Sequence, residues 1–586
     1  MMTTEIGQQR YLQALEQSLR IIRNADRLSL EASIEELCKI QLMVLYFEQK
    51  NEASLLRYIE ELRYSHEDVK DFYKRYFRTY VPVNAFKGWE QLFVNKSSFV
   101  QVVETLSEEN LFSCEKWDKA YAFSAFLQLH YAGYLSEYST PEILCRFVNM
   151  VLGTEEILSL ADPCCGLGGM LVEAIKLRNS HLRIKGFDVS QRMANTANLQ
   201  FLMYGYHESS VECKDALETA VAYMDGPYEA IAAHLPLRHR AFSLAGKRQE
   251  GVDRMFSRIQ EDIFISQILK MLRPGGVAAL VVSDELLTTE RRAESRRWLY
   301  KNAQVLNITR FDGISYNGSS NVRAYNVMFV KNLISSASDV CMATLIKEGT
   351  SEEEIMHTAQ QIRKAIHEQD TNLSYNSQYF RLLKEDVWNV NLLFAKEKMG
   401  ARYPTVILKD LVFSDRQRAR VIDDRNYKQL TVKIKGLGVV ERESEYIGTS
   451  SSNNIRFVAH GGQIIMSSLD ADKGAVGIVP KELNNALVSR NYYLFTIVSD
   501  NIDPDYLVMV LSSEPVLRQL RQHKRGYIMA RISIEKILSL VIPSPSIEEQ
   551  RILVGKLMRK VKRVMQIQDE LEKEQKEFAW NLFGEE

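Results

Sequence analysis

A glycine-rich segment between residues 161 and 171 constrains the fold of this chain more than any other stretch. The apolar residues 157–161 lead into Asp162 and Pro163. Three glycines follow: Gly166, Gly168 and Gly169. Apolar residues then recur at helical spacing over 170–177. This succession predicts a strand, a tight turn and a helix, which together seat a nucleotide-like ligand at the helix N-terminus. Taken alone, such a loop also occurs as a plain turn.

The same segment reads Asp-Pro-Cys-Cys-Gly-Leu-Gly-Gly-Met-Leu over residues 162–171. It closely resembles the DPxCGxGGxL loop of adenine-N6 DNA methyltransferases of type I restriction-modification systems. The resemblance implies a Rossmann-like methyltransferase fold, with S-adenosylmethionine as the cofactor in place of a dinucleotide. The loop residues that it implies in cofactor binding are Asp162, Pro163, Cys165, Gly166, Gly168 and Gly169.

Thr140 and Pro141 lie upstream of this loop and form a helix-start signal. The pattern predicts the Thr140 hydroxyl as N-cap and Pro141 as the first helical residue. The pair also resembles the G-x-x-x-TP segment that helps these methyltransferases bind the cofactor, with Ser136 in place of the glycine. We expect Thr140 and Pro141 to serve in both ways.

Two acidic residues downstream complete the expected cofactor site. Asp188 follows residues 183–187, and an acid at the end of the second strand accepts hydrogen bonds from ribose hydroxyls. Asp215 stands where the family's acid approaches the adenine of the cofactor. Each acid alone is more often a surface residue or a cap, but together their order and spacing resemble the family's.

The expected strand at 229–233 leads into the position of the catalytic tetrapeptide. In the family this tetrapeptide is Asn-Pro-Pro followed by an aromatic residue. Its amide oxygen and a proline carbonyl accept hydrogen bonds from the amino group of an extruded adenine, and its ring stacks on the base. This chain reads His-Leu-Pro-Leu, so Pro236 is kept and Leu237 cannot stack. A neutral imidazole at His234 can still accept one hydrogen bond. We therefore assign His234 and Pro236 to a degenerate catalytic site with impaired or lost methyl transfer, and an active enzyme is the alternative.

The sequence predicts three parts within residues 1–403. Residues 1–130 predict an N-terminal helical bundle, because apolar residues recur there at helical spacing and glycine is scarce. Residues 131–335 predict the methyltransferase-like domain that binds the cofactor. Residues 336–403 predict a connector with a strand at 341–346 and a helix at 352–368.

Residues 404–546 resemble the target-recognition domain of type I specificity subunits, an α+β fold. The most specific elements are G-x-x-x-x-R-I at 526–532 and IP-x-P-x-x-x-EQ-x-I at 542–552. A basic cluster precedes and overlaps them, and it suits contacts to DNA phosphates, a solvated charged helix being the alternative. The DNA-binding residues that we assign are Arg518, Arg521, Lys524, Arg525, Tyr527 and Arg531.

Residues 547–586 predict a long helix with an apolar face. Packing against its own domain is one interpretation. In specificity subunits two such helices pair, whereas this chain has one, so the resemblance implies self-association or a half-specificity partner.

The length, charge and cysteine content of the chain limit its fold class, the extent of any DNA-binding surface and its compartment. The chain has 586 residues, which is too long for one core, so the fold class is multidomain α/β. Its net charge of -1 requires any DNA surface to be local. Seven cysteines without zinc-like spacing predict a cytoplasmic protein with no metal site, and no signal peptide or membrane span is visible.

We therefore expect a protein that binds double-stranded DNA and S-adenosylmethionine within a restriction-modification or phage-defence system. Besides an active methyltransferase, the alternative is a non-enzymatic scaffold that holds a nuclease or translocase partner on DNA. No nuclease or helicase motif is present in the sequence.

Overall fold

A computed structural model describes most of the chain, and it divides into two compact units, Met1–Val390 and Asn391–Glu586. Each unit is described by itself. The residues described are 5–49, 55–82, 86–107, 115–132, 140–177, 181–207, 211–217, 226–236, 259–313, 324–332, 340–367, 377–382, 388–391, 394, 403–419, 426–442, 446–447, 456–523 and 531–584.

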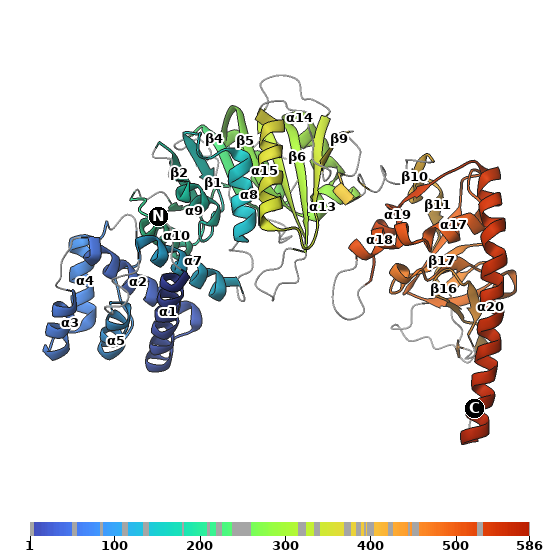
Figure 1. Ribbon diagram of the computed structural model, residues 1–586, viewed down its shortest axis with the longest axis horizontal. Helices are drawn as coiled ribbons and strands as arrows, with labels where there is room; N and C mark the ends of the chain where they lie inside the picture. The colour runs from blue at the N-terminus through green and yellow to red at the C-terminus, as the bar shows by residue number, and fades with distance from the viewer. Residues whose placement is uncertain are drawn as a thin grey trace. The chain divides into compact units, whose positions relative to one another are not determined.

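The first unit begins with helices (Figure 1). They are α1 (Glu5–Asp26), α2 (Leu30–Gln49), α3 (Leu55–Tyr64), α4 (Val69–Tyr80), α5 (Lys96–Leu106) and α7 (Lys116–Ala132). Side-chain caps fix two of the helix starts: Asp68 accepts a hydrogen bond from the Lys70 amide, and Asn95 accepts one from the Ser98 amide. The helices share a buried apolar core that continues into the sheet that follows.

A mixed sheet of nine described strands forms the centre of this unit, in the order β3-β2-β1-β4-β5-β7-β6-β8-β9. The strands are β1 (Ser159–Asp162), β2 (Arg183–Asp188), β3 (Val211–Cys213), β4 (Tyr228–His234), β5 (Leu272–Val282), β6 (Ala303–Asp312), β7 (Ala324–Asn332), β8 (Val340–Ile346) and β9 (Ser377–Arg381). The strands β1 to β5 run parallel, and β7 lies antiparallel between β5 and β6. Strand order reverses between β1 and β4, and ligands of open α/β sheets bind at such a point.

Helices separate the strands: α8 (Glu142–Leu152), α9 (Gly169–Lys176), α10 (Gln191–Met203), α12 (Gln260–Met271), α13 (Asp284–Thr288), α14 (Ala293–Asn302) and α15 (Glu352–His367). The helical bundle is fastened to this layer through α10. Its Arg192 forms ion pairs with Glu31 and Glu35 of α2, at 3.0 and 2.8 Å. Asn195 of α10 donates a hydrogen bond to the Lys87 carbonyl at 3.0 Å.

The sheet continues beyond residue 335, where we expected a connector to begin. β8 pairs with β6 over Asn307–Phe311, and β9 pairs with β8. The helix that follows β8, α15, lies beside α8 in Figure 1. Its Arg363 forms an ion pair with Glu156 at 2.8 Å. Residues 340–367 are therefore part of the same layer as the expected methyltransferase-like domain.

The second unit is an α+β structure. Its strands are β10 (Thr405–Ile407), β11 (Val412–Ser414), β12 (Asn426–Tyr427), β13 (Leu430–Val432), β14 (Val439–Glu441), β15 (Tyr446–Ile447), β16 (Arg456–Ala459), β17 (Ile464–Ser467), β18 (Val476–Ile478), β19 (Ala486–Ser489), β20 (Tyr492–Ile497) and β21 (Val541–Pro543). Four of them form a sheet in the order β11-β20-β17-β18, and β10 pairs with β21. Its helices are α17 (Pro504–Leu511), α18 (Glu514–His523), α19 (Ile534–Leu538) and α20 (Ile547–Phe583).

The long helix α20 runs along the second unit in Figure 1. It begins at the Ser546 cap, which accepts a hydrogen bond from the Glu549 amide. Gln550 anchors this first turn, because its amide donates to the carbonyls of Asn501 and Pro545. Among the described helices of both units, none combines the length and the apolar character needed to cross a bilayer.

Candidate functional site

The glycine loop has the predicted geometry. Asp162 ends β1, and α9 begins at Gly169. Gly168 adopts φ +81°, a left-handed conformation that favours glycine. A Cβ atom there would lie 2.9 Å from the Phe201 ring and 3.2 Å from the Ala197 Cβ atom. The loop is therefore tight because α10 packs directly against it.

Asp162 is buried at the start of this loop, with 2% of its surface exposed. One of its carboxylate oxygens accepts a hydrogen bond from the Cys164 amide at 3.0 Å. Burial raises the pKa of Asp162 to about 7, against a weaker opposing effect of that hydrogen bond. A cation that binds against this carboxylate would favour its charged form.

Asp188 connects the end of β2 to the same loop. One oxygen accepts a hydrogen bond from the Gly166 amide at 3.0 Å, and the other accepts one from the Ser190 amide at 2.8 Å. Burial raises the pKa of this carboxyl, and the two amide donors act in the opposite direction. Asp188 thus ends β2 and also holds the glycine loop in place.

Asp215 lies just beyond β3 and accepts a hydrogen bond from the Leu217 amide at 3.0 Å. The position of β3 is fixed by Asn198 of α10, whose side chain accepts from the Val211 amide and donates to the Val211 carbonyl, each at 3.0 Å. Asp188 thus ends β2 and Asp215 follows β3, so the two expected acids lie at the carboxyl ends of adjacent strands.

The expected capping role of Thr140 is wrong. The N-cap of α8 is Pro141 with no side-chain hydrogen bond, so Pro141 is not the first helical residue either. The Thr140 hydroxyl is instead hydrogen-bonded to Nδ1 of His234, at 3.0 Å. A tertiary partner thus replaces the local capping interaction. Ser136, the other residue of this predicted segment, lies outside the described residues.

His234 is the last residue of β4 and its imidazole is neutral at pH 7. Burial lowers its pKa to about 4. The Tyr325 ring of β7 meets the imidazole edge to face, with ring centroids 5.9 Å apart. Pro236 follows two residues later, while Leu237 lies outside the described residues. Leu235, which replaces the family's first proline, donates its amide hydrogen to the Val281 carbonyl at 3.2 Å.

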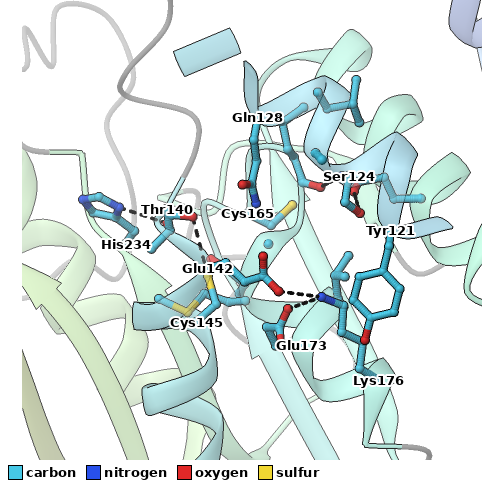
Figure 2. Close-up of a pocket in the computed structure, with 18 of the residues that line it drawn as sticks. Tyr121, Ser124, Gln128, Thr140, Glu142, Cys145, Cys165, Glu173, Lys176 and His234 are labelled. Atoms are coloured by element: carbon cyan, nitrogen blue, oxygen red, sulfur yellow. Dashed lines mark hydrogen bonds and ion pairs between the residues drawn. The ribbon is translucent and has the colours of Figure 1, made fainter. Parts of the chain in front are cut away.

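A cavity of about 160 Å³ joins several of these groups (Figure 2). The predicted residues that line it are Thr140, Asp162, Cys165, Gly169 and His234. The remaining predicted residues of the first unit do not line it: Pro141, Pro163, Gly166, Gly168, Asp188, Asp215 and Pro236. The cavity therefore covers the part of the site between the loop and the expected catalytic position.

The far end of this cavity contains a charged group that sequence reasoning missed. Nζ of Lys176 lies 2.5 Å from Glu173 and 3.2 Å from Glu142, and 4.4 Å from the centre of the Tyr121 ring. Figure 2 shows Lys176 between the two carboxylates and beside Tyr121. Glu173 and Lys176 are three residues apart on α9. This spacing places two side chains next to each other on a helix, so it could have predicted their ion pair from the sequence. The ion pair with Glu142 fastens α9 to the first turn of α8, next to Thr140.

The predicted DNA-binding residues that the structure describes lie on two different segments of the second unit. Arg518 and Arg521 lie on α18 and both pair with Glu514, at 3.3 and 2.7 Å. Arg531 is exposed in the segment before α19. Lys524, Arg525 and Tyr527 lie outside the described residues. Among the described residues of both units, no cluster of histidine, cysteine and acidic side chains is suited to a metal ion.

Comparison with known proteins shows what part of the first unit is similar to. Residues 126–389 match the family model of the N-6 DNA methylases. The chain therefore carries an N-6 DNA methylase-like domain. Its cofactor is S-adenosylmethionine, and the tight glycine loop beside a buried carboxylate suits a ligand that carries a positively charged ammonium group.

Two curated relatives show partial similarity. A tRNA (guanine(10)-N2)-dimethyltransferase of Pyrococcus abyssi (strain GE5 / Orsay) is 34% identical over 96 residues, which are 16% of this chain and 27% of that protein. The type I restriction enzyme EcoEI methylase subunit of Escherichia coli is 22% identical over 279 residues, which are 43% of this chain and 55% of that subunit. The chain thus spans about a quarter and about half of the lengths of these relatives.

A solved structure supports the fold. A protein described as a modification subunit of a type I restriction enzyme from Vibrio vulnificus YJ016 superposes with a TM-score of 0.50 at 15% identity. The superposition covers 65% of this chain and 93% of that chain. At this identity the similarity shows a shared fold.

Proposed function

We propose that this protein binds S-adenosylmethionine and recognises specific DNA within a type I-like restriction-modification or phage-defence system, with methyl transfer to adenine impaired or lost. One observation carries the proposal. The glycine loop and its buried acids are complete, whereas the end of β4 presents the His234 imidazole, bound to Thr140, in place of an asparagine amide.

Different residues of the first unit would bind different groups of the cofactor. When bound, S-adenosylmethionine supplies an activated methyl group. The Asp162 carboxylate would accept a hydrogen bond from the cofactor's ammonium group, because this buried carboxylate has a single amide partner in the described structure. Asp188 would bind the ribose hydroxyls with the lone pairs that the Gly166 and Ser190 amides leave unused. Asp215 stands at the next strand end, toward the adenine.

The end of β4 supports weak catalysis at best. An amide oxygen on a short side chain can accept a hydrogen bond from the adenine amino group beside the methyl donor, and His234 has no such oxygen. Positioning errors of about 1 Å reduce rates by about a hundredfold, so the loss of amide, proline and aromatic ring together predicts a large defect.

The test is modification-sensitive long-read sequencing of DNA from cells that express the protein with its neighbouring genes. We expect no methylated adenine at any recurring motif, while the purified protein binds S-adenosylmethionine. Methylated adenine at one recurring site would overturn the proposed loss of methyl transfer and would reveal the target sequence.

An active methyltransferase is the second candidate, and one observation favours it. His234 is neutral, and Thr140 engages only Nδ1, so Nε2 has no hydrogen-bond partner among the described residues. If Nδ1 carries the proton and donates a hydrogen bond to the Thr140 hydroxyl, Nε2 can accept a hydrogen bond from an amino group. A non-enzymatic scaffold that holds a nuclease or translocase on DNA would instead show no saturable binding of the cofactor.

Cofactor affinity is expected to increase with pH. In the free protein the Asp162 carboxyl has a pKa of about 7, and a bound ammonium group lowers that pKa, so binding below pH 7 must release a proton. Affinity should rise by up to about tenfold per unit between pH 5 and 7, stop rising above pH 7, and fall again once the α-amino group of the cofactor loses its proton at about pH 8. Calorimetry in two buffers of different ionisation enthalpy measures the proton. Asp162→Asn should bind weakly with little pH dependence, and a wild-type affinity independent of pH would contradict this role.

The second unit supplies DNA recognition and association in this proposal. The apolar residues Leu557, Val564, Leu571 and Phe578 recur every seventh residue along α20, the spacing of coiled-coil helices. Their side chains are 46% to 66% exposed, so the described part of their own unit does not cover them. We propose that they pair with the same helix of a second copy, so that two recognition units read a two-part site; a half-specificity subunit is the alternative partner.

Val564→Lys is expected to convert a dimer into a monomer. A lysine at the centre of the apolar stripe would have to be buried in the paired helices. Light scattering after size-exclusion chromatography measures the mass. Gln566→Lys, two residues away on the same helix, adds the same charge and should leave the dimer intact. If the wild type is monomeric, or Val564→Lys remains dimeric, α20 is not the site of self-association.

A further inference from the structure

The second unit contains another group of arginines, carried by strands and turns instead of α18. We propose that Arg418 and Arg490, arranged around Arg416, form the surface through which this unit contacts the phosphates of double-stranded DNA. We call these three residues the arginine surface. This assignment rests on the proposed DNA recognition and names the residues responsible for it.

Backbone pairing brings the arginine surface together from two separate segments, with β16 between them. Arg418 forms a bridge with Phe457 of β16, and the Arg456 carbonyl accepts a hydrogen bond from the Ala419 amide at 2.9 Å. Arg456 pairs with Ser489 in the ladder of β16 and β19, and Arg490 follows Ser489 directly, in the turn that leads into β20. Arg416, Arg418 and Arg490 therefore occupy neighbouring positions at one end of these strands, whereas the side chain of Arg456 alternates to the other face from Phe457.

Arg416 serves as the framework of this surface. Its guanidinium donates to the carbonyls of Arg490, at 3.1 Å, and Tyr492. The same group lies 4.9 Å from the centre of the Phe457 ring and 4.4 Å from that of Tyr493. Cation–π contacts and two carbonyl acceptors thus hold the turn that carries Arg490 against the strand that carries Arg456.

The exposed charges of the arginine surface are not paired with acids in the described structure. Arg418 and Arg490 are exposed, and neither forms an ion pair within the described part of the chain. The segments that carry the surface, 415–419 and 486–493, contain three arginines and a single acid, Asp415. In contrast, Arg518 and Arg521 of α18 share Glu514. Arg418 and Arg490 are therefore better placed to bind external anions.

A sequence-predicted residue lies close to this surface. Burial raises the pKa of the Tyr493 phenol, and the positive charges of Arg416 and Arg531 oppose that shift, so Arg531 is within electrostatic reach of Tyr493. Glu535 is also within reach and marks an acidic border. Arg531 extends the positive charge toward the segment that resembles the family's G-x-x-x-x-R-I element.

Duplex DNA is the occupant that the rest of the chain favours. The surface is an array of guanidinium groups at strand ends, which suits a row of phosphates, since planar guanidinium groups bind phosphate oxygens in pairs. The first unit of the same chain carries an N-6 DNA methylase-like domain. Contacts to phosphates position a protein on DNA and do not depend on sequence, so they can be measured without knowing the target.

The test compares three double variants of the full-length chain, each of which removes two positive charges. Arg418→Gln with Arg490→Gln removes the exposed members of the arginine surface. Arg518→Gln with Arg521→Gln removes the charges of α18. Lys481→Gln with Lys556→Gln, both exposed residues that belong to neither group, is the control. Affinity for a fluorescent duplex of about 30 base pairs, nearly three helical turns, is measured across salt concentrations, and thermal unfolding verifies the fold.

The Arg418 and Arg490 variant is expected to bind DNA about tenfold more weakly, with the slope of log affinity against log salt reduced by about two. The control should keep the wild-type slope. The inference is overturned if the slope persists in this variant, if only the α18 variant loses it, or if all three variants weaken binding equally. Failure of the wild type to bind any duplex would instead refute the proposed DNA recognition itself.

Discussion

Replacing His234 with asparagine and Leu237 with phenylalanine is expected to raise methyl transfer to DNA adenine by about a hundredfold or more. The asparagine restores a short amide whose oxygen accepts a hydrogen bond from the target amino group, and the phenylalanine restores a ring that stacks on the extruded base. His234 ends β4 beside the intact glycine loop, with Cys164 Sγ 3.4 Å from its carbonyl oxygen, so the new amide would lie close to the cofactor loop. Transfer of tritiated methyl groups to unmethylated DNA measures the rate.

The matched control is His234→Gln with Leu237→Phe, which supplies the same amide on a longer side chain and should gain little. Leu235 is left unchanged, because its amide donates to the Val281 carbonyl and proline has no amide hydrogen. If the wild type is inactive and the asparagine variant binds cofactor and DNA but gains no activity, His234 is not the cause of the defect. If the wild type already transfers methyl groups as fast as the asparagine variant, an imidazole suffices at this position.

The cofactor loop was predictable because its constraints are local. The left-handed φ at Gly168 and the turn from Asp162 into α9 follow from the order of residues within one short segment. Asp188 was predictable for a related reason, since parallel strands present their carboxyl ends at one edge of a sheet. Its second role, holding the Gly166 amide, depends on how close β2 lies to the loop and is not visible in the sequence.

The missed features depend on partners far apart in the chain. Thr140 has the local pattern of a helix cap, but its hydroxyl is bound by His234, 94 residues later. Lys176 looks like one end of an ordinary helical ion pair until Glu142 of α8 and Tyr121 of α7 are placed beside it. The strand at 341–346 was expected, yet an apolar strand does not state which sheet it joins, and β8 extends the central one.

Charge patterns in the sequence leave out the partners that folding supplies. The spacing of Arg518 and Arg521 suggests an open basic helix, whereas Glu514, four and seven residues earlier, pairs with both. Arg418 and Arg490 are far apart in sequence and come together only through strand pairing. The assignment of Arg518 and Arg521 to DNA contacts stays a prediction, and the arginine surface is the competing one.

Asp188→Ala is expected to weaken the binding of S-adenosylmethionine by about a hundredfold or more. The change removes the acceptor for the Gly166 and Ser190 amides, and a buried amide left without a partner costs about 1–3 kcal/mol. It also removes the carboxylate that would hold the ribose hydroxyls. Since about 1.4 kcal/mol corresponds to a tenfold change in affinity, the two losses together account for the expected effect.

Asp188→Asn separates the two contributions. It keeps the size of the side chain and one acceptor oxygen, so one of the two amides retains its partner and affinity should fall less than in the alanine variant. Isothermal titration calorimetry measures the affinities, and thermal unfolding without cofactor reports how far the loop itself is destabilised. Because this side chain ties the Gly166 amide to β2, beside the backbone hydrogen bond from the Cys165 amide to the Phe187 carbonyl, we expect the alanine variant to lose stability and affinity together. An alanine variant that binds the cofactor as tightly as the wild type would exclude Asp188 from the site.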